Sequence, residues 1–493
     1  MSAISTIHPF ESTSGSAKMM KPVNLLLVLL LTAAVGMAAA QTGAMGAGAF
    51  IGLIAAGVYF YFLFTKPVVG IYTAVVLSFT LIGIGRYIKG LQVGLGMDGI
   101  LILTYIAIFF HRFKEKIDWS PANKDITYLA LIWLGYSLFE IINPEARSFE
   151  AWFSGRGVSV YFFLLVPLTL MYLNTSRRLD MFLYAWGIWS VLATLKGIMQ
   201  MKFGVDFAEQ AWLDEGNYKT HILFGKLRVF SFLSDAGQFG ANQGYSGVVA
   251  IIYAMAQKNR RKKIFFYAVG FLGLYGMFIS GTRGSMSVPL AGFMIFFVLR
   301  KNIKVLSIGV SLIAIIFIFF KFTLIGQGNA QIRRMRTAFD PNDASLQVRL
   351  NNQKILKGYL ASRPFGGGIG HGGVKAQKYL PNAFLSQIAT DSWYVLIWVE
   401  QGIVGLTLHL FILFYVLIKA CYRIMFKIRS PELKLKLSAL TAGMAGIMVA
   451  SYGNAVLGTM PTGPLLYISM AILMNSDYLE KQFETKSEPV KTN

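Results

Sequence analysis

Long apolar segments separated by short polar ones run along most of the chain. A hydrocarbon core about 30 Å thick needs roughly 20 helical residues to cross it. Since backbone groups that face lipid must be satisfied within their own segment, these stretches are expected to be helices. We therefore predict an all-α polytopic membrane protein with about 12–14 transmembrane helices. The predicted spans are 23–40, 47–64, 67–85, 94–110, 126–143, 157–174, 181–201, 238–256, 264–280, 284–299, 305–325, 392–418, 437–452 and 455–474.

The first predicted span has a second interpretation. Lys18 and Lys21 precede a long apolar run that ends in the small residues 38–40, as in a cleaved signal peptide. The run is long for a signal peptide, which favours an uncleaved first helix.

Composition supports membrane insertion. Apolar and aromatic residues make up 55% of the chain and charged residues 14%, where a soluble domain carries about a quarter. A single cysteine, Cys421, excludes a disulfide framework or a cysteine-based metal cluster. The five histidines are scattered, so we predict neither a metal site nor a cofactor.

Basic residues predict the orientation. The clusters 258–263, 300–304 and 419–436 are separated by even numbers of spans, so they lie on one side, taken as cytoplasmic. Both termini then lie on that side too. The net charge of +23 follows mainly from this topology and gives the protein an affinity for anionic lipid headgroups. It gives no reason to invoke nucleic acid.

The chain is predicted to form one membrane domain, residues 21–476, between cytoplasmic tails 1–20 and 477–493. The domain includes two long extracytoplasmic loops, 202–237 and 326–391. Loops of such length are usually functional or disordered.

The second loop has the pattern of a structured segment. Residues 340–343, Asp-Pro-Asn-Asp, predict a turn and a helix cap. An amphipathic helix is predicted over 345–361, and a second short helix from about 382 to 389.

The outer face carries more arginines than the positive-inside rule predicts. Long translocated loops largely escape that rule, which accounts for several of them singly. Arg283 differs, because it lies in a very short turn between two spans: it is a functional candidate or an arginine that extends to the headgroups. Guanidinium groups bind phosphate bidentately, so a phosphate-bearing lipid suits this face. The arginines are Arg228, Arg283, Arg333, Arg334, Arg336, Arg349 and Arg363.

Three further features have alternative interpretations. The run Gly366-Gly367-Gly368 is either an anion-binding nest of N–H groups or a plain turn. Asp391, where the loop re-enters the membrane, is either a helix N-cap or a catalytic base. Glu400 is expected to be a structural partner of a buried cation.

Several motifs, in this order, resemble the O-antigen ligase / O-antigen polymerase family of bacterial envelope proteins, over about residues 225–420. Arg228-Val229-Phe230-Ser231-Phe232 is similar to its Arg-x-x-(Gly/Ser)-Phe element, with Asp235-Ala236-Gly237 where relatives often have Pro-Asn. Thr282-Arg283-Gly284-Ser285 resembles a Ser-Arg-Gly turn. Arg349 with Pro364-Phe365-Gly366-Gly367-Gly368 resembles an Arg…Pro-x-x-Gly-x-Gly stretch. Asp391-Ser392-Trp393-Tyr394 with Glu400 and Gly402 matches a His-Asn-x-Tyr…Glu-x-Gly pattern in spacing.

The resemblance implies a bacterial inner-membrane glycosyltransferase that acts at the periplasmic face. Its donor would be an undecaprenyl-diphosphate-linked glycan, and its partners membrane lipids and other polysaccharide-assembly proteins. Arg228, Arg283 and Arg349 would stabilise the leaving diphosphate, Arg156 would help hold it, and Asp391 would take the acceptor proton. Attack opposite the leaving group would invert the anomeric centre. The first outer loop, residues 41–46, has no acidic residue, which predicts metal independence.

One departure from the family pattern matters. Relatives often have histidine where this chain has Asp391, which weakens a ligase assignment and favours a polymerase. A flippase of lipid-linked oligosaccharides and a non-catalytic assembly partner remain rival interpretations.

Overall fold

The computed structural model describes residues 36–37, 40, 48–88, 90, 92–111, 116–223, 225–337, 340 and 342–487. The chain divides into two units, Met1–Thr65 and Lys66–Asn493. The first contains the apolar helix Gly48–Thr65. Nearly all of the predicted span 23–40 lies outside the described residues.

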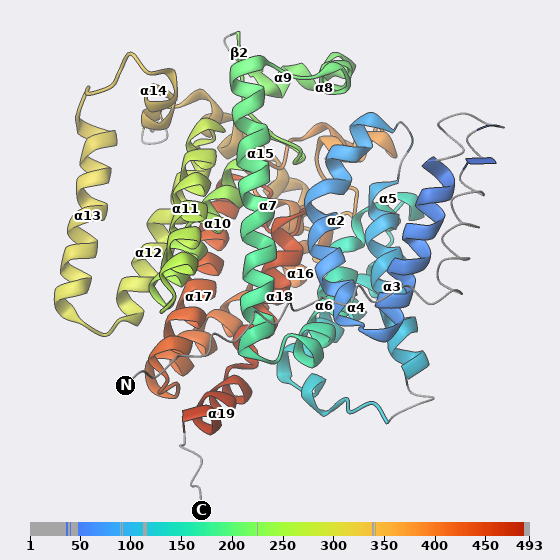
Figure 1. The fold of residues 1–493 in the computed structure, drawn as a ribbon. Helices are drawn as coiled ribbons and strands as arrows, with labels where there is room; N and C mark the ends of the chain where they lie inside the picture. The colour runs from blue at the N-terminus through green and yellow to red at the C-terminus, as the bar shows by residue number, and fades with distance from the viewer. Residues whose placement is uncertain are drawn as a thin grey trace, which may run out of the picture. The chain divides into compact units, whose positions relative to one another are not determined.

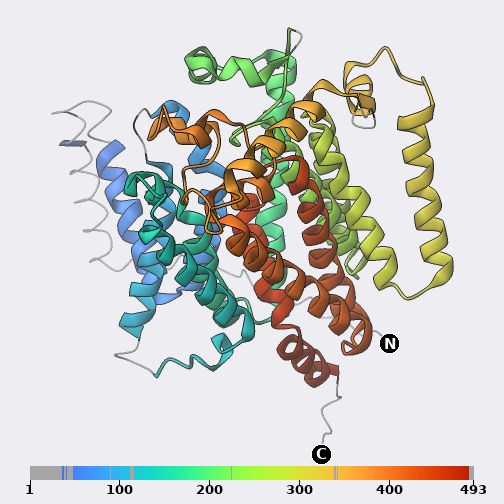
Figure 2. The same ribbon diagram turned by 180° about the vertical axis from the view of Figure 1, so that it is seen from behind.

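The second unit is a bundle of helices (Figures 1 and 2). Together with Gly48–Thr65, its helices match the predicted spans from 47–64 onward. Short helices connect some of them: η1 (Ser120–Ala122), η2 (Glu140–Ile142), α5 (Phe149–Gly155) and η4 (Arg283–Met286), with α19 (Ser476–Ser487) after the last. The long helices are α2 (Val68–Tyr87), α3 (Val93–His111), α4 (Asp125–Phe139), α6 (Gly157–Tyr172), α7 (Ser176–Phe203), α10 (Ala236–Met255), α11 (Arg260–Ile279), α12 (Ser287–Leu299), α13 (Ile303–Phe322), α16 (Trp393–Phe426), α17 (Pro431–Gly453) and α18 (Thr462–Met474).

The predicted all-α polytopic class is confirmed. Among the described residues, eight helices are long and apolar enough to cross a membrane, or nine if the bent pair α5 and α6 forms one span, and three shorter apolar helices accompany them. α10 falls outside this set although it has 20 residues. It carries Gln238, Asn242 and Gln243, all of them buried. Such polar side chains are tolerated because they face other helices rather than lipid.

Glycines allow close packing at the centre of the bundle. A Cβ on Gly273 would lie 2.9 Å from the carbonyl oxygen of Gln243 on α10, and one on Gly446 would lie 2.5 Å from that of Val288 on α12. Small residues permit such backbone approaches between membrane helices. Accordingly, 83% of the most apolar stretch of α17 is buried, against 6% in α13, so α17 is central and α13 turns most of its surface outward.

The basic clusters gather at one end of the bundle, as predicted. Lys301 lies 4.4 Å from the centre of the Phe426 ring and donates to the Met425 carbonyl oxygen at 3.4 Å, which joins the second cluster to the third. Lys262, of the first cluster, approaches the ring of Tyr184 near the start of α7, at the same end of the bundle. We call this the basic end.

Both long loops lie at the opposite end, which we call the loop end (Figure 1). Loop 202–237 contains α8 (Phe207–Trp212), η3 (Leu213–Asn217), α9 (Tyr218–His221) and the antiparallel pair β1 (Ile222–Leu223) and β2 (Lys226–Leu227). Loop 326–391 contains α14 (Ala330–Arg336), α15 (Ala344–Leu360), η6 (Val374–Lys378) and η7 (Phe384–Gln387).

The predicted amphipathic helix is α15, and Asp343 is its N-cap, accepting a hydrogen bond from the Leu346 N–H at 3.0 Å. Leu356 and Leu360 are buried against Leu385 and Val399. The second predicted helix, 382–389, is only the short 3₁₀ segment η7.

The glycine run is joined to a break in α16. Gly402 has φ +66° inside that helix, so its neighbours lose their usual helical hydrogen bonds. The N–H groups of Gly367 and Gly368 donate instead to the carbonyl oxygens of Val399 and Glu400, at 2.8 and 2.9 Å. Backbone groups at membrane depth must find partners, and this loop supplies them.

We expect Gly402→Ala to destabilise the protein. A Cβ on Gly402 would lie 1.9 Å from the Pro364 carbonyl oxygen, and a positive φ costs a side-chain-bearing residue roughly 1–3 kcal/mol. Thermal unfolding of the purified protein in detergent measures the effect. Gly358→Ala is the control, because the added Cβ meets nothing within 4 Å and should be neutral or stabilising. Equal midpoints for the two variants would contradict the expectation.

Candidate functional site

Four arginines from four separate segments converge at the loop end. Arg228 follows β2, Arg283 begins η4, Arg334 lies on α14 and Arg349 on α15. Burial lowers the pKa of Arg228, and the positive charges of Arg283 and Arg349 lower it further, whereas Asp235 opposes them. The three arginines singled out from the sequence are therefore electrostatic neighbours. We call these four residues the arginine cluster.

Arg334 is the member that sequence reasoning left among the ordinary loop arginines. Burial, followed by the charges of Arg228 and Arg283, lowers its pKa to about 10. Its aliphatic stem lies beside Gly281, where a Cβ would be 3.7 Å from the Arg334 Cδ. The adjacent Arg333 is exposed. Only the direction in which α14 faces separates the two, and the sequence did not reveal it.

The Thr282 hydroxyl ties two of the motifs together. It accepts a hydrogen bond from the Arg228 guanidinium at 3.1 Å and donates one to the Ala236 carbonyl oxygen at 2.8 Å. Arg228 also donates to the Thr220 carbonyl oxygen at 3.1 Å. The Nε–H of Arg228 is buried and meets no acceptor among the described residues. Buried donors normally have a hydrogen-bond acceptor, and an anionic ligand would supply one here.

Three carboxylates hold the cluster together without neutralising it. Arg283 donates to Asp343 at 2.5 Å and to the Thr337 hydroxyl at 2.8 Å. Arg349 and Asp391 form an ion pair with Nε and Oδ2 3.4 Å apart. Four guanidinium groups thus face three carboxylates, counting Asp235, which leaves a positive excess suited to an anion.

The third carboxylate, Asp235, caps α10 by accepting from the Gln238 N–H at 2.9 Å. Burial alone raises the pKa of Asp235. The charge of Lys375, the Gln238 N–H and the Ser234 hydroxyl outweigh that effect, so its pKa is lowered. Lys375, on η6, therefore adds a further positive charge beside the cluster.

Asp391 does not cap a helix. The N-cap of α16 is Ser392, and no side chain caps that end. The Asp391 side chain is 45% exposed and faces a small open cleft between α15 and α16, which Arg349 and Gln353 also line. The cleft is continuous with the arginine cluster through Arg349.

Three other predicted site features, Arg156, the glycine run and Glu400, lie apart from the arginine cluster. Arg156, at the junction of α5 and α6, forms an ion pair with Asp98 of α3. The N–H groups of Gly366, Gly367 and Gly368 donate to the carbonyl oxygens of Arg363, Val399 and Glu400. Because these N–H groups already have acceptors, the run packs the loop against α16 and does not form an anion nest.

Glu400 forms no ion pair with a described residue, contrary to the expected cation partner. Its carboxylate accepts from the Gly372 N–H at 3.4 Å. It therefore helps to anchor the loop on α16, a structural role of a different kind.

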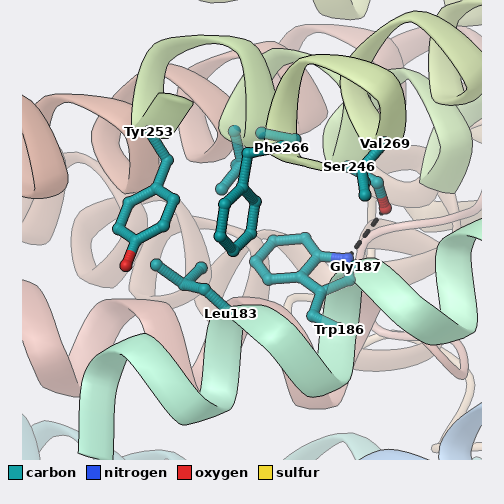
Figure 3. Close-up of a pocket in the computed structure, with 9 residues that line it drawn as sticks. Leu183, Trp186, Gly187, Ser246, Tyr253, Phe266 and Val269 are labelled. Carbon is teal, nitrogen blue, oxygen red and sulfur yellow. Dashed lines mark hydrogen bonds between the residues drawn. The ribbon is translucent and has the colours of Figure 1, made fainter. Parts of the chain in front are cut away.

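A second cavity lies inside the bundle between α7, α10 and α11 (Figure 3). Phe266, Tyr253 and Leu183 line it, and Trp186 donates to the Ser246 hydroxyl at 2.8 Å. It has no charged side chain in its lining, so it offers nothing that would bind a phosphate or activate a hydroxyl.

The fold and the site together define a polytopic membrane protein with a cationic, carboxylate-containing site at the loop end. Residues 268–410 match the model of the O-antigen ligase family, which supports membership of the chain in that family. The matched segment includes Arg283, Arg334, Arg349 and Asp391, and Arg228 lies outside it. No curated protein compared with the chain matches it.

We expect Asp343→Asn to weaken the attachment of α15 to η4. Asparagine caps a helix about as well as aspartate, so the change removes the charge opposite Arg283 and keeps the cap. The loss should be about 1–2 kcal/mol near neutral pH. Thermal unfolding midpoints of the two proteins measure it, and Asp340→Asn, an exposed residue of the same turn, is the control.

The same pair predicts a pH dependence. The hydrogen bond from Arg283, followed by the other contacts, lowers the folded-state pKa of Asp343 below its ordinary value of 3.8. Its contribution is therefore complete above pH 3.8 and is lost as the pH falls through the folded pKa. The difference between wild type and Asp343→Asn should shrink in that acidic range; a difference that grew there would contradict the assignment.

Proposed function

We propose that the protein transfers a glycan from an undecaprenyl-diphosphate carrier to an acceptor hydroxyl, as an O-antigen or exopolysaccharide polymerase or ligase. The family match supports glycan transfer of the ligase or polymerase type in general. The observation that carries the finer proposal is the arginine cluster beside Asp391. A diphosphate needs several fixed cations, and an acceptor hydroxyl needs a base close to them.

In this scheme the arginine cluster binds the diphosphate of the donor. The bond between the anomeric carbon and the phosphate oxygen breaks, and negative charge develops on the diphosphate that leaves. Fixed donors aimed at such charge stabilise the transition state. Arg228, Arg283, Arg334 and Arg349 supply guanidinium N–H groups for this purpose.

Asp391 takes the proton of the acceptor hydroxyl as its oxygen bonds to the anomeric carbon. Arg349 holds Oδ2 of Asp391, which leaves Oδ1 to receive the proton. Geometry of this kind is the first requirement for a general base. Attack opposite the leaving diphosphate inverts the anomeric centre, so one base suffices and no covalent intermediate is needed.

We propose that the reaction needs no metal, since the arginines supply the positive charge that a divalent cation would otherwise provide. The carboxylates near the cluster are each committed to a hydrogen bond or an ion pair. Within the described ranges, no three histidine, cysteine or acidic side chains form a ligand set.

The proposed setting is a bacterial inner membrane, with the loop end facing the periplasm and the basic end facing the cytoplasm. The positive-inside rule supports this orientation. Lipid-linked glycan is the substrate, and other polysaccharide-assembly proteins are proposed partners.

Removal of a cluster cation should slow transfer sharply. We expect Arg283→Ala and Arg334→Ala each to lower the rate by roughly 100-fold or more, as for loss of one charge-stabilising donor. Asp391→Asn should lower it by about 100- to 10,000-fold, as for loss of a general base. Consumption of lipid-linked glycan by the purified protein measures these rates. Arg333→Ala, next to Arg334 and exposed, should retain wild-type activity; full activity in the first three variants would remove the assignments.

The metal-free scheme has its own test. Glycan consumption by the wild-type protein should be unchanged after treatment with EDTA. Activity that disappears on chelation and returns with Mg²⁺ would overturn metal independence and leave the residue assignments open to separate test.

A further inference from the structure

The cleft between α15 and α16 differs chemically from the arginine cluster beside it. One guanidinium and one carboxylate, those of Arg349 and Asp391, already pair across it, so their charges cancel. The rest of its lining is neutral: the amides of Asn352 and Gln353, Ser392, and the apolar Ala389 and Val395. Such a surface offers hydrogen bonds to hydroxyl groups and an apolar wall, without the positive excess that binds a phosphate.

The two amides are not equivalent. Asn352 donates to the Ala389 carbonyl oxygen at 3.2 Å and so fixes α15 against the segment before α16. Gln353 is half-buried, and the described residues give it no hydrogen-bond partner. Its carbonyl oxygen and amide N–H groups are therefore available to a ligand in the cleft.

The cleft also has a suitable position. Its enclosed volume is about 10 Å³, enough for about one water molecule, so a sugar ring would lie over its open mouth with a hydroxyl directed into it. Asp391 lines it, and Arg349 joins it to the cluster. A hydroxyl bound there would lie beside the proposed base and next to a donor held by the arginines.

We propose that this cleft is the acceptor subsite, that it binds a neutral sugar residue at the end of the acceptor glycan, and that Gln353 determines its specificity. This inference rests on the proposed function. It divides the site into a cationic half for the donor diphosphate and an electrically neutral half for the acceptor sugar.

The experiment separates the two halves with Gln353→Ala. Labelled lipid-linked glycan from the source bacterium serves as donor, and unlabelled lipooligosaccharide or unlabelled lipid-linked glycan is titrated as acceptor. We expect the acceptor KM to rise roughly fivefold to tenfold, as for loss of a hydrogen bond or two, with kcat at saturating acceptor within about twofold. Binding of undecaprenyl diphosphate to protein in nanodiscs, measured by calorimetry, should be unchanged.

Two further variants sharpen the result. Gln353→Trp should cover the mouth of the cleft and abolish transfer while undecaprenyl diphosphate still binds. Asn351→Ala removes an exposed amide of the same helix that does not line the cleft, and it should behave as wild type. An unchanged acceptor KM in Gln353→Ala, or weaker undecaprenyl diphosphate binding, would overturn the subsite. A wild-type protein that neither binds undecaprenyl diphosphate nor consumes donor would instead overturn the proposed function.

Discussion

Mutual repulsion among the guanidinium groups of the arginine cluster is the constraint on which the loop end depends. Burial and neighbouring positive charge lower the pKa of both Arg228 and Arg334. The folded protein therefore holds these cations close together and partly shielded from water, although they repel one another. Such an arrangement persists only when the surrounding structure fixes it. Strongly perturbed groups with specific charged neighbours are typical of functional sites, and a polyanionic ligand would relieve the repulsion.

The structure meets this constraint with contacts that each join segments far apart in the sequence. Thr282 connects Arg228 to the start of α10, and Asp343 connects Arg283 to the start of α15. The loop that follows α15 is fixed by another device, because the break at Gly402 frees carbonyl groups that Gly367 and Gly368 then satisfy. The loop is thus part of the hydrogen bonding of α16, and it holds Asp391 and Arg349 in register with the bundle.

The proposed function requires one site to bind two chemically different ligands, and this construction suits both. Positive charge is concentrated where Arg228, Arg283 and Arg334 meet. In the neighbouring cleft, Arg349 pairs with Asp391, so that part of the site carries no net charge. Arg349 belongs to both halves, so a diphosphate and a hydroxyl would be held on either side of one side chain. Preorganisation of this kind removes much of the entropic cost of bringing two reactants together.

The sequence by itself determined the helical spans after the first, the common end of the basic clusters, and α15 with its Asp343 cap, because hydrophobic length, charge bias and local turn chemistry are encoded within short windows. It also identified Arg228, Arg283, Arg349 and Asp391 as candidates. Only the tertiary structure decided that Arg334 rather than Arg333 joins them and that Arg156 pairs with Asp98. It also decided that N–H groups of the glycine run donate to carbonyl oxygens of α16. Those outcomes depend on which side chains and backbone groups meet across dozens or hundreds of residues, and no local pattern records that pairing.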